Sequence, residues 1–177
     1  SGGAFSESPE YDQNIKPWPF DPEAAKKLLD EAGWVDTDSD GIRDKDGAPF
    51  KFEFLIPSGS REIEQMATVY KEELQRAGID MTIRMLEWAT FIEDLTKRKF
   101  DAVTLRWAIP VDQDPYQVWH SSQTEKGSNY PGFKNEEVDR ILEQARLEFD
   151  RDKRNAMYRQ WHAILHEEQP YTFLFNL

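Results

Sequence analysis

The sequence predicts an α/β fold in which helices flank a mixed sheet. Segments in which apolar and polar residues alternate, the period of a half-buried strand, occur between segments whose apolar residues recur with the period of a helix. Strands that alternate with helices are usually joined by crossovers, so we expect parallel pairing in at least part of the sheet. With 177 residues, the chain is long enough for one domain with a substantial core.

The first half of the chain contains the clearer signals for individual elements. Asp21 suits an N-cap, Pro22 suits the first position of a helix, and Gly33 ends that helix. A second helix is expected from Ser58-Gly59-Ser60 to about residue 77, where Gly78 ends it. Alternating apolar side chains predict a strand on either side of it, at Phe50, Phe52, Phe54 and Ile56 and again at Ile79, Met81, Ile83 and Met85.

The second half begins with a capping-box pattern, in which Thr90 and Glu93 predict the start of a helix. Residues 102–107 are predicted as a mostly apolar strand buried on both faces. Asp114, interpreted as an N-cap, begins a short helix with Pro115. Further along, we expect a loop at 121–133, helices at about 135–148 and 151–167, and a strand at 171–175.

Both ends of the chain carry expectations about domain organisation. Ser1-Gly2-Gly3 resembles a cloning remnant, and residues 1–19, which include three prolines, are expected to form an extended N-terminal segment. Residues 20–177 are expected to form a single α/β lobe. Because the chain stops at Leu177 directly after an apolar segment, we expect that it was cut where it would cross into another domain.

Composition argues against several classes of function. The net charge of −12 repels phosphate backbones and anionic lipid headgroups, so nucleic acid and membrane surfaces are not expected partners. There is no cysteine, which excludes thiol nucleophiles, disulfides and thiolate metal sites. No apolar run approaches the ~20 residues of a membrane span, and no signal peptide is recognisable.

An acidic loop at residues 36–47 carries the strongest local motif. Its carboxylates follow the spacing of an EF-hand calcium loop, but Gly47 stands at position 12, where that loop has a bidentate Glu. Losing two of about seven oxygens predicts at most a weak calcium site. The favoured interpretation is a solvated turn that leads into a β-hairpin. The four candidate calcium ligands are Asp36, Asp38, Asp40 and Asp44, at positions 1, 3, 5 and 9, with Gly41 at position 6.

Enzymatic and metal signatures are weak elsewhere. His162 and His166 have the four-residue spacing that presents two imidazoles to one metal, but Ala163 stands where the zincin motif needs Glu. Nothing in the sequence places His120, the third histidine, near them. Two histidines on a polar helix face are therefore the favoured interpretation. The chain has no nucleophile elbow, Walker loop or dinucleotide fingerprint, and no carboxylate pair stands out from the acidic background.

Four aromatic residues flank the predicted strand at 102–107 and the short helix and loop that follow it. They are Trp107, Tyr116, Trp119 and Tyr130. Because open α/β sheets bind ligands beyond the carboxyl ends of their strands, these rings could line a cleft. For Trp107 and Trp119, the alternative is a place in the core.

Several motifs occur in an order that resembles one known family. Residues 20–34 resemble the helix that opens its C-terminal lobe, and residues 36–47 its Asp/Gly-rich loop. The family is that of the family 5 extracellular solute-binding proteins, the oligopeptide, dipeptide and nickel receptors of ABC importers. The resemblance spans roughly residues 20–177. Its further motifs are Phe100-Asp101-Ala102 to Trp107, Asp114-Pro115-Tyr116, Gly127-Ser128-Asn129-Tyr130, Arg154 to Tyr158, and Glu168-Gln169-Pro170-Tyr171.

The resemblance implies a lobe of the type II periplasmic-binding-protein fold, one of two lobes that close over a ligand by hinge motion. It implies a transport receptor and not an enzyme, which captures peptides or similar polar solutes and delivers them to the membrane permease of an ABC importer. It also implies a periplasmic or extracellular monomer without a cofactor. The N-terminal lobe, with any lipid anchor, would be absent from this chain.

The resemblance also implies which residues contact the ligand. In peptide-binding relatives, the segment after the strand's Trp supplies an Asp that pairs with the α-amino group of the ligand. Here that position falls near Pro110, and the nearest acidic residue is Asp112. The alternative ligands are an oligosaccharide or a metal chelate such as nickel, and the alternative class is a carboxylate-dependent hydrolase. The candidate ligand-binding residues are Trp107, Asp112, Tyr116, Trp119, Asn129 and Tyr130.

Overall fold

The computed structural model describes residues 8–107 and 114–174, so the candidate ligand residue Asp112 lies outside the described residues. The chain divides into two compact units. The first unit is Pro19–Trp107, and the second combines Ser1–Trp18 with Ala108–Leu177. The expectation that residues 20–177 form a single lobe stays a prediction.

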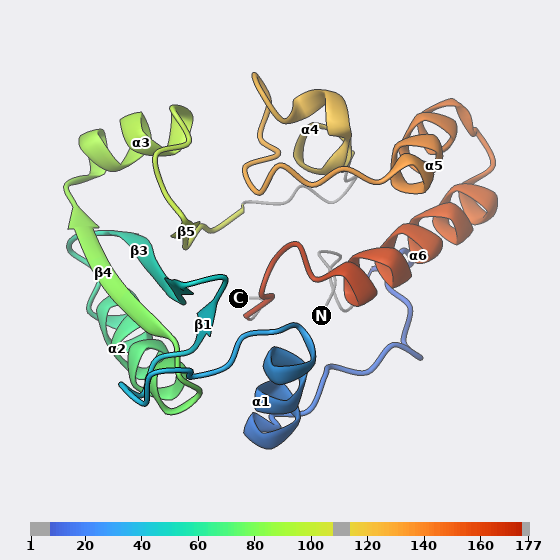
Figure 1. Ribbon diagram of the computed structural model, residues 1–177. Helices are drawn as coiled ribbons and strands as arrows, with labels where there is room; N and C mark the ends of the chain where they lie inside the picture. Colours follow the sequence, from blue (N-terminus) through green and yellow to red (C-terminus); the bar gives the residue numbers. More distant parts are fainter. Residues whose placement is uncertain (1–7, 108–113, 175–177) are drawn as a thin grey trace. The chain divides into compact units, whose positions relative to one another are not determined.

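A three-stranded parallel sheet forms the centre of the first unit (Figure 1). Its strand order is β4 (Asp80–Leu86), β3 (Lys51–Pro57) and β5 (Ala102–Val103). β3 pairs with β4 along its whole length, whereas β5 contributes only two residues to the other side. Residues 54–56 are all buried. Successive side chains of a strand point to opposite faces, so the centre of β3 is covered on both faces.

Two helices pack against this sheet. α2 (Arg61–Arg76) contacts β3 and β4, and α3 (Trp88–Thr96) contacts β3. The hydroxyl of Ser60 accepts the backbone N–H of Ile63 and caps α2, which confirms the predicted bounds of this helix. The core beneath α2 consists of Phe54, Ile56, Ala67 and Met81.

Two elements of the first unit differ from their predictions. α3 begins at Trp88 after Glu87, and no side chain caps it, so Thr90 and Glu93 lie inside the helix and form no capping box. β5 ends at Val103 and does not continue to residue 107, because only its two residues pair with β3. The two residues of β5, Ala102 and Val103, are half-buried. An apolar run indicates that a strand can form there. It does not indicate how many of its residues pair with a neighbouring strand.

α1 (Pro22–Glu31) and the acidic loop follow their predictions in outline. The Asp21 carboxylate accepts the backbone N–H of Ala24 at 2.9 Å and caps α1. However, α1 buries no residue, and its Leu28 side chain is 65% exposed. The expected β-hairpin after the acidic turn is confirmed, since β1 (Asp44–Lys45) pairs antiparallel with β2 (Ala48–Pro49). Parallel and antiparallel pairs thus lie in two separate sheets.

The second unit is helical in its described residues. Its elements are α4 (Tyr116–Trp119), a 3₁₀ turn η1 (Ser121–Gln123), α5 (Glu136–Leu147) and α6 (Arg151–Glu168). α5 and α6 lie side by side (Figure 1). Each is capped by the side chain of the preceding residue. Across the described residues of both units, none of the helices is both long and apolar enough to cross a membrane. The core of the second unit consists of Trp119, Val138, Ile141, Leu142, Ala145, Tyr158, Trp161 and Leu165.

The predicted strand at 171–175 does not form in its described part, residues 171–174. Tyr171 and Phe173 instead pack against Trp119, with ring centroids 4.6 and 6.1 Å away. The alternating apolar run therefore buries its side chains against the helical core and not within a sheet.

Candidate functional site

The parallel sheet of the first unit has a carboxyl edge, formed by the residues that directly follow β3, β4 and β5. Ligands of open parallel sheets bind beyond this end of the strands. The backbone N–H of Ser58 donates to the carbonyl of Leu86 at 2.8 Å, and its hydroxyl donates to the Glu87 carboxylate at 3.2 Å. The ends of β3 and β4 are thus hydrogen-bonded to each other and give the edge a defined shape.

Two tryptophans follow strands of this sheet. Trp88 follows β4 and is 62% exposed, with its ring stacked on Phe91 at a centroid distance of 5.6 Å. Trp107, a predicted ligand residue, follows β5 and is 37% exposed, so it is not a core residue of the described structure. Sequence reasoning missed Trp88. Its position between a predicted strand and a predicted helix was a signal that could have found it.

The carboxyl edge also carries charges of both signs. The Ser60 hydroxyl donates to the Glu62 carboxylate at 3.0 Å. The pKa of Glu62 is lowered, first by the hydrogen bond from its own backbone N–H, then by the Ser60 hydroxyl and the positive charge of Arg106. Arg106 follows β5 and is exposed. Glu62 therefore stays ionised near a guanidinium at the edge where a ligand would bind.

In the second unit, Trp119 is a core residue. Its side chain is buried, and its ring packs against Phe133 and Trp161 at centroid distances of 6.2 Å each. Of the two interpretations that the sequence left open for Trp119, the structure supports the core position. Direct contact between Trp119 and a ligand has no structural support.

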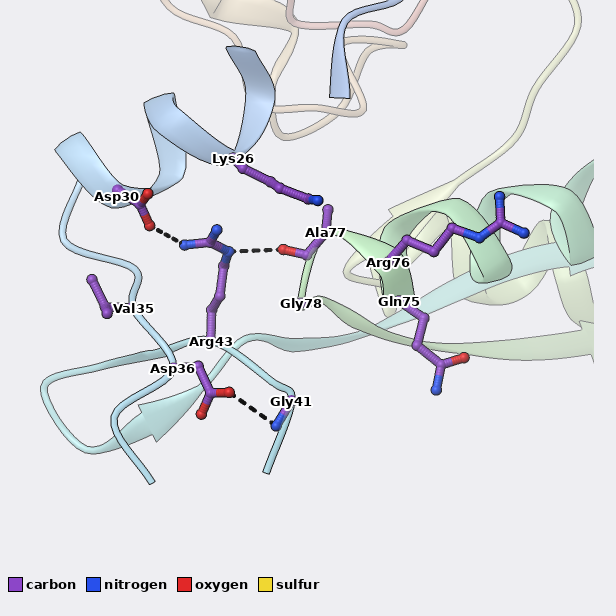
Figure 2. Close-up of a pocket in the computed structure, with 10 residues that line it drawn as sticks. All are labelled: Lys26, Asp30, Val35, Asp36, Gly41, Arg43, Gln75, Arg76, Ala77 and Gly78. Atoms are coloured by element: carbon purple, nitrogen blue, oxygen red, sulfur yellow. Dashed lines mark hydrogen bonds and ion pairs between the residues drawn. The ribbon is translucent and has the colours of Figure 1, made fainter. Parts of the chain in front are cut away.

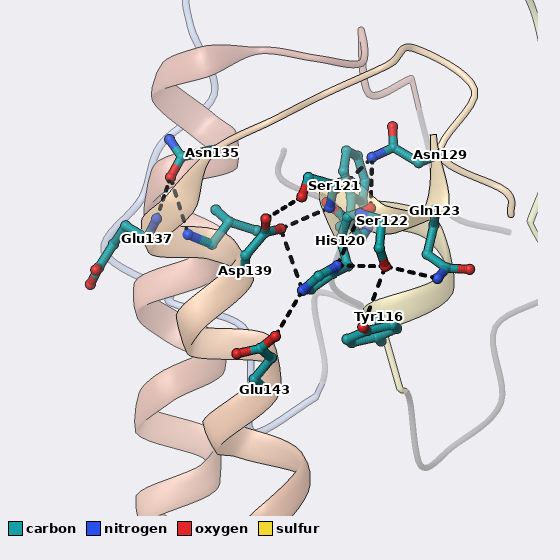
Figure 3. Close-up of polar contacts among 12 residues, drawn as sticks. Tyr116, His120, Ser121, Ser122, Gln123, Asn129, Asn135, Glu137, Asp139 and Glu143 are labelled. Atoms are coloured by element: carbon teal, nitrogen blue, oxygen red, sulfur yellow. Dashed lines mark hydrogen bonds and ion pairs between the residues drawn. The ribbon is translucent and has the colours of Figure 1, made fainter. Parts of the chain in front are cut away.

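Asn129 is completely buried and holds the loop between α4 and α5 (Figure 3). Its Nδ2 donates to the carbonyls of Phe133 at 2.8 Å and His120 at 3.1 Å, and its Oδ1 accepts the backbone N–H of Phe133 at 3.0 Å. Buried amides are almost always satisfied in this way. The structure therefore gives Asn129 a loop-holding role, and its predicted ligand contact has no structural support.

Tyr116 is packed among side chains of its own unit. Its ring stacks on His120 at a centroid distance of 4.1 Å, and the Arg146 guanidinium lies 4.5 Å from the ring centroid. Its hydroxyl is 3.4 Å from the Ser122 hydroxyl (Figure 3). Tyr130, which lies in the loop that Asn129 holds, is half-buried. Tyr116 is half-buried as well, so the ligand contact of both tyrosines stays a prediction.

A polar network joins this loop to α5 (Figure 3). Asp139 accepts the backbone N–H of Ser121 at 2.8 Å and also accepts its hydroxyl. The Nε2 atom of His120 lies 3.3 Å from the Glu143 carboxylate, and its Nδ1 atom lies 2.8 Å from the Ser122 hydroxyl.

The order Ser122, His120, Glu143 resembles the hydroxyl, imidazole and carboxylate of a nucleophilic enzyme. However, Nδ1 of His120 also accepts the backbone N–H of Ser122 at 3.1 Å, which makes the imidazole the cap of η1. A ring nitrogen that accepts a backbone donor does not serve as a base for the adjacent hydroxyl. The network thus explains the shape of the loop and gives no support to hydrolysis.

In the acidic loop, three of the four candidate calcium ligands come together. Carboxylate oxygens of Asp36, Asp38 and Asp40 lie within 4.8 Å of one another, and all three residues are exposed. In the described part of the chain, Asp44 does not join this group. Its carboxylate instead accepts the backbone N–H and the hydroxyl of Thr37, at 3.2 and 3.1 Å.

The same carboxylates already accept backbone hydrogen bonds within the loop. Asp36 accepts the N–H of Gly41 at 3.0 Å (Figure 2), and Asp40 accepts the N–H of Ile42 at 2.7 Å. These bonds shape the turn, and calcium binding by the loop stays a prediction.

An open cavity of about 350 Å³ lies beside the acidic loop and the ends of α1 and α2 (Figure 2). Arg43 lines it, donating to the carbonyls of Ala77 at 2.8 Å and Trp34 at 2.6 Å and pairing with Asp30. Gly78 has a φ of +84°, and a Cβ atom there would lie 2.9 Å from Cγ of Arg43. Arg43 thus joins the carboxyl ends of two helices, and Gly78 leaves space for its side chain.

His162 and His166 do not lie on a polar helix face, because both are buried in the second unit. Nδ1 of His162 accepts the backbone N–H of Asp12 at 3.1 Å. The ring of His166 stacks on Trp18 at a centroid distance of 5.1 Å. In the residues that the structure describes, neither histidine belongs to a cluster of three metal-ligating side chains.

Comparison with known proteins shows the family of this chain. Residues 2–129 match the family described as bacterial extracellular solute-binding proteins, family 5 Middle. The chain is 36% identical over 166 residues to the oligopeptide-binding protein AppA of Bacillus subtilis, covering 93% of this chain and 31% of AppA. It is 33% identical to Protein XP55 of Streptomyces lividans, covering 97% of this chain and 31% of XP55. The chain therefore belongs to the family 5 bacterial extracellular solute-binding proteins.

Solved structures agree with this assignment. AppA of Bacillus subtilis in complex with a nonapeptide is similar with a TM-score of 0.93 and 35% identity, covering 98% of this chain and 35% of that chain. NikZ of Campylobacter jejuni in complex with Ni(L-His) is similar with a TM-score of 0.84 and 26% identity, covering 93% of this chain and 34% of that chain. The predicted α/β fold of the periplasmic-binding-protein type is confirmed. The chain spans about a third of the length of these relatives.

Proposed function

We propose that this chain is one lobe of a peptide receptor of an ABC importer. The receptor captures peptides in a cleft between two lobes and delivers them to a membrane permease. Family membership supports this function, as does the similarity to AppA, whose structure contains a nonapeptide. Because the chain spans about a third of AppA, the rest of the protein supplies the remaining ligand contacts, and this chain alone binds peptide weakly.

The observation that carries the proposal is that two exposed tryptophans, Trp88 and Trp107, follow strands β4 and β5 of a parallel sheet. Indole rings are large, rigid and apolar on their faces, so they can cover peptide side chains of many kinds at small entropic cost. Such a surface suits a receptor that accepts peptides of varied sequence.

Peptide termini require charged partners. Glu62, whose carboxylate stays ionised, and Arg106 provide one group of each sign at the carboxyl edge. A guanidinium can donate two parallel hydrogen bonds to a carboxylate, which suits the C-terminus of a peptide. Asp112 remains our proposed partner of the α-amino group, and Tyr130 a proposed further contact.

A metal chelate is the second candidate ligand. NikZ, at 26% identity and a TM-score of 0.84, contains nickel bound to L-histidine. Indole rings and an Arg could also hold the organic part of such a chelate.

The proposed role is capture without catalysis and without a cofactor, by a monomer outside the cytoplasm. The family is one of extracellular solute-binding proteins, which supports this location. Anchoring by a lipid ahead of residue 1 belongs to the same proposal.

Calorimetric titration of the full-length protein that contains this chain tests the function. A nonapeptide and the nickel–histidine chelate are titrated separately. Binding of the nonapeptide, with no heat from the chelate, is the expected result. Binding of the chelate alone would overturn the peptide proposal while keeping the receptor class.

A further inference from the structure

An Asp-Gly pair is a point at which a protein chain can change its backbone linkage without an enzyme. The carboxyl carbon of the aspartate lies near the backbone nitrogen of the next residue, and glycine has no side chain to hinder an attack by that nitrogen. The sequence contains two such pairs, Asp40-Gly41 and Asp46-Gly47. Both pairs are exposed and belong to the first unit, so the local sequence and exposure do not distinguish them.

The reaction needs no reactant other than water. The glycine nitrogen attacks the carboxyl carbon of the aspartate, a carbon–nitrogen bond forms, and a carboxyl oxygen leaves as water with the amide proton and the carboxyl proton. Water then opens the resulting succinimide ring. When it attacks the former backbone carbonyl, the bond from that carbonyl to nitrogen breaks and the chain continues through the side chain, as isoaspartate. Nothing is oxidised or reduced, and the mass of the chain does not change.

Hydrogen bonds hold both reacting groups of the Asp40-Gly41 pair. The Gly41 N–H, which carries the attacking nitrogen, donates to the Asp36 carboxylate at 3.0 Å (Figure 2). The Asp40 carboxylate, which would be attacked, accepts the backbone N–H of Ile42 at 2.7 Å. Because the attack requires the Gly41 nitrogen and the Asp40 carboxyl carbon to turn toward each other, both hydrogen bonds must open first.

The Asp46-Gly47 pair forms the two-residue turn between β1 and β2. Asp46 has a φ of +53° and Gly47 a φ of +77°, as the tight turn of a two-residue hairpin requires. Among the described residues, none makes a hydrogen bond to the Asp46 carboxylate or accepts one from the Gly47 N–H. A Cβ atom at Gly47 would meet nothing within 4 Å. Both reacting groups therefore face water, and no neighbouring side chain restrains them.

We propose that Asp46 is a site of spontaneous isoaspartate formation, and that the folded chain directs this modification to Asp46 and away from Asp40. The inference does not depend on the proposed function. The modification inserts the Cβ atom of Asp46 into the backbone of a two-residue turn. Because the length of the turn sets the register of β1 and β2, the pairing of Lys45 with Ala48 should loosen.

Peptide mapping of the folded protein after prolonged incubation tests the proposal. Trypsin cleaves after Lys and Arg, so the two pairs fall on different peptides, residues 28–43 and residues 46–51. The isoaspartyl peptide has the same mass but elutes separately, and electron-transfer fragmentation locates the altered residue. We expect Asp46 to isomerise about tenfold faster than Asp40, since two hydrogen bonds hold the Asp40-Gly41 pair and each contributes roughly twofold to tenfold. Equal rates in the folded protein would overturn the proposal.

The same incubation in urea separates the effect of the fold from that of the local sequence. Unfolding opens the hydrogen bonds at Asp40 and Gly41, so the two pairs should isomerise at similar rates. A preference for Asp46 that persists unchanged in urea would assign the difference to neighbouring residues and contradict direction by the fold. Isomerisation of Asp46 only in urea would also contradict it.

A variant tests the protection of Asp40 directly. Asp36→Ala removes the acceptor of the Gly41 N–H. In the folded variant, isomerisation at Asp40 should become roughly twofold to tenfold faster, the contribution of one hydrogen bond, whereas the rate at Asp46 should stay unchanged. An unchanged rate at Asp40 would show that its hydrogen bonds do not protect it.

Discussion

Asn129 and Phe133 exchange two hydrogen bonds, in which the Asn129 amide donates to the Phe133 carbonyl at 2.8 Å and accepts the Phe133 N–H at 3.0 Å. The side chain of Asn129 thus pairs with the backbone as a neighbouring peptide group would. Because Asn129 is completely buried, water cannot replace these bonds. The conformation of the loop after α4 therefore depends on one amide.

Replacing this amide should be costly. In Asn129→Ala, the carbonyl and the N–H of Phe133 lose this partner, and the His120 carbonyl keeps the N–H of Gln123. We expect the free energy of unfolding to fall by about 2–4 kcal/mol, since each unsatisfied buried group costs about 1–3 kcal/mol. Urea denaturation followed by circular dichroism measures it. Asn135→Ala, which removes only the N-cap of α5, should cost about 1 kcal/mol. Equal costs for the two variants would contradict the loop-holding role.

Arg43 should stabilise the first unit. Arg43→Ala leaves the carbonyls of Ala77 and Trp34, at the ends of two helices, without their guanidinium donor. We expect a loss of about 1–3 kcal/mol in the free energy of unfolding. The control is Arg76→Ala, because Arg76 is exposed and pairs only within α2, with Glu73, so its removal should cost less than about 0.5 kcal/mol. Urea denaturation compares the two variants. A loss of stability in Arg43→Ala no larger than that of the control would contradict a stabilising role for the hydrogen bonds from Arg43 to the two helix ends.

Trp88 should matter for ligand affinity and not for folding. In the full-length protein, Trp88→Ala should weaken nonapeptide binding by about tenfold to a hundredfold, the effect typical of an aromatic anchor. Calorimetry gives the dissociation constants. Phe149→Ala is the matched control, because Phe149 is 98% exposed between α5 and α6 and should leave affinity unchanged. Wild-type affinity in Trp88→Ala would remove the carboxyl edge from the proposed site.

Calcium should bind the acidic loop weakly. Only Asp36, Asp38 and Asp40 come together, and Gly47 stands at the position of the bidentate Glu. We expect a dissociation constant of about a millimolar or weaker. Calorimetric titration with CaCl₂ measures this dissociation constant. Asp38→Asn should lower any heat of calcium binding, whereas Asp46→Asn, outside the group of three, should leave it unchanged. Micromolar affinity would mean that another carboxylate completes the site.

The elements that the sequence predicted well are those whose signals are local. Asp21 and Ser60 cap α1 and α2 through backbone N–H groups within three residues, so a short window of sequence contains all the information. The alternation in 50–56 and 79–85 likewise marked β3 and β4.

Features that depend on distant partners could not be predicted in this way. β5 is short because only two residues pair with β3, and residues 171–174 pack on Trp119 instead of joining a sheet. The histidine spacing in α6 suggested a metal pair or a polar face. Instead, the His162 ring accepts a hydrogen bond from the backbone of Asp12, 150 residues away in the sequence.

The candidate site shows the same division. The sequence predicted which chain segments would lie near a ligand, but it could not separate exposed aromatic residues from buried ones. Trp107 is exposed and Trp119 is core, although both are Trp residues beside predicted elements. Burial is set by packing in three dimensions, which no local pattern records.

Native mass spectrometry of the full-length protein that contains this chain, purified without unfolding, tests the central claim most directly. A peptide receptor should carry a series of bound masses that correspond to peptides of varied sequence and that disappear on unfolding. A single bound mass that corresponds to a sugar or a metal chelate would contradict the peptide receptor proposed here.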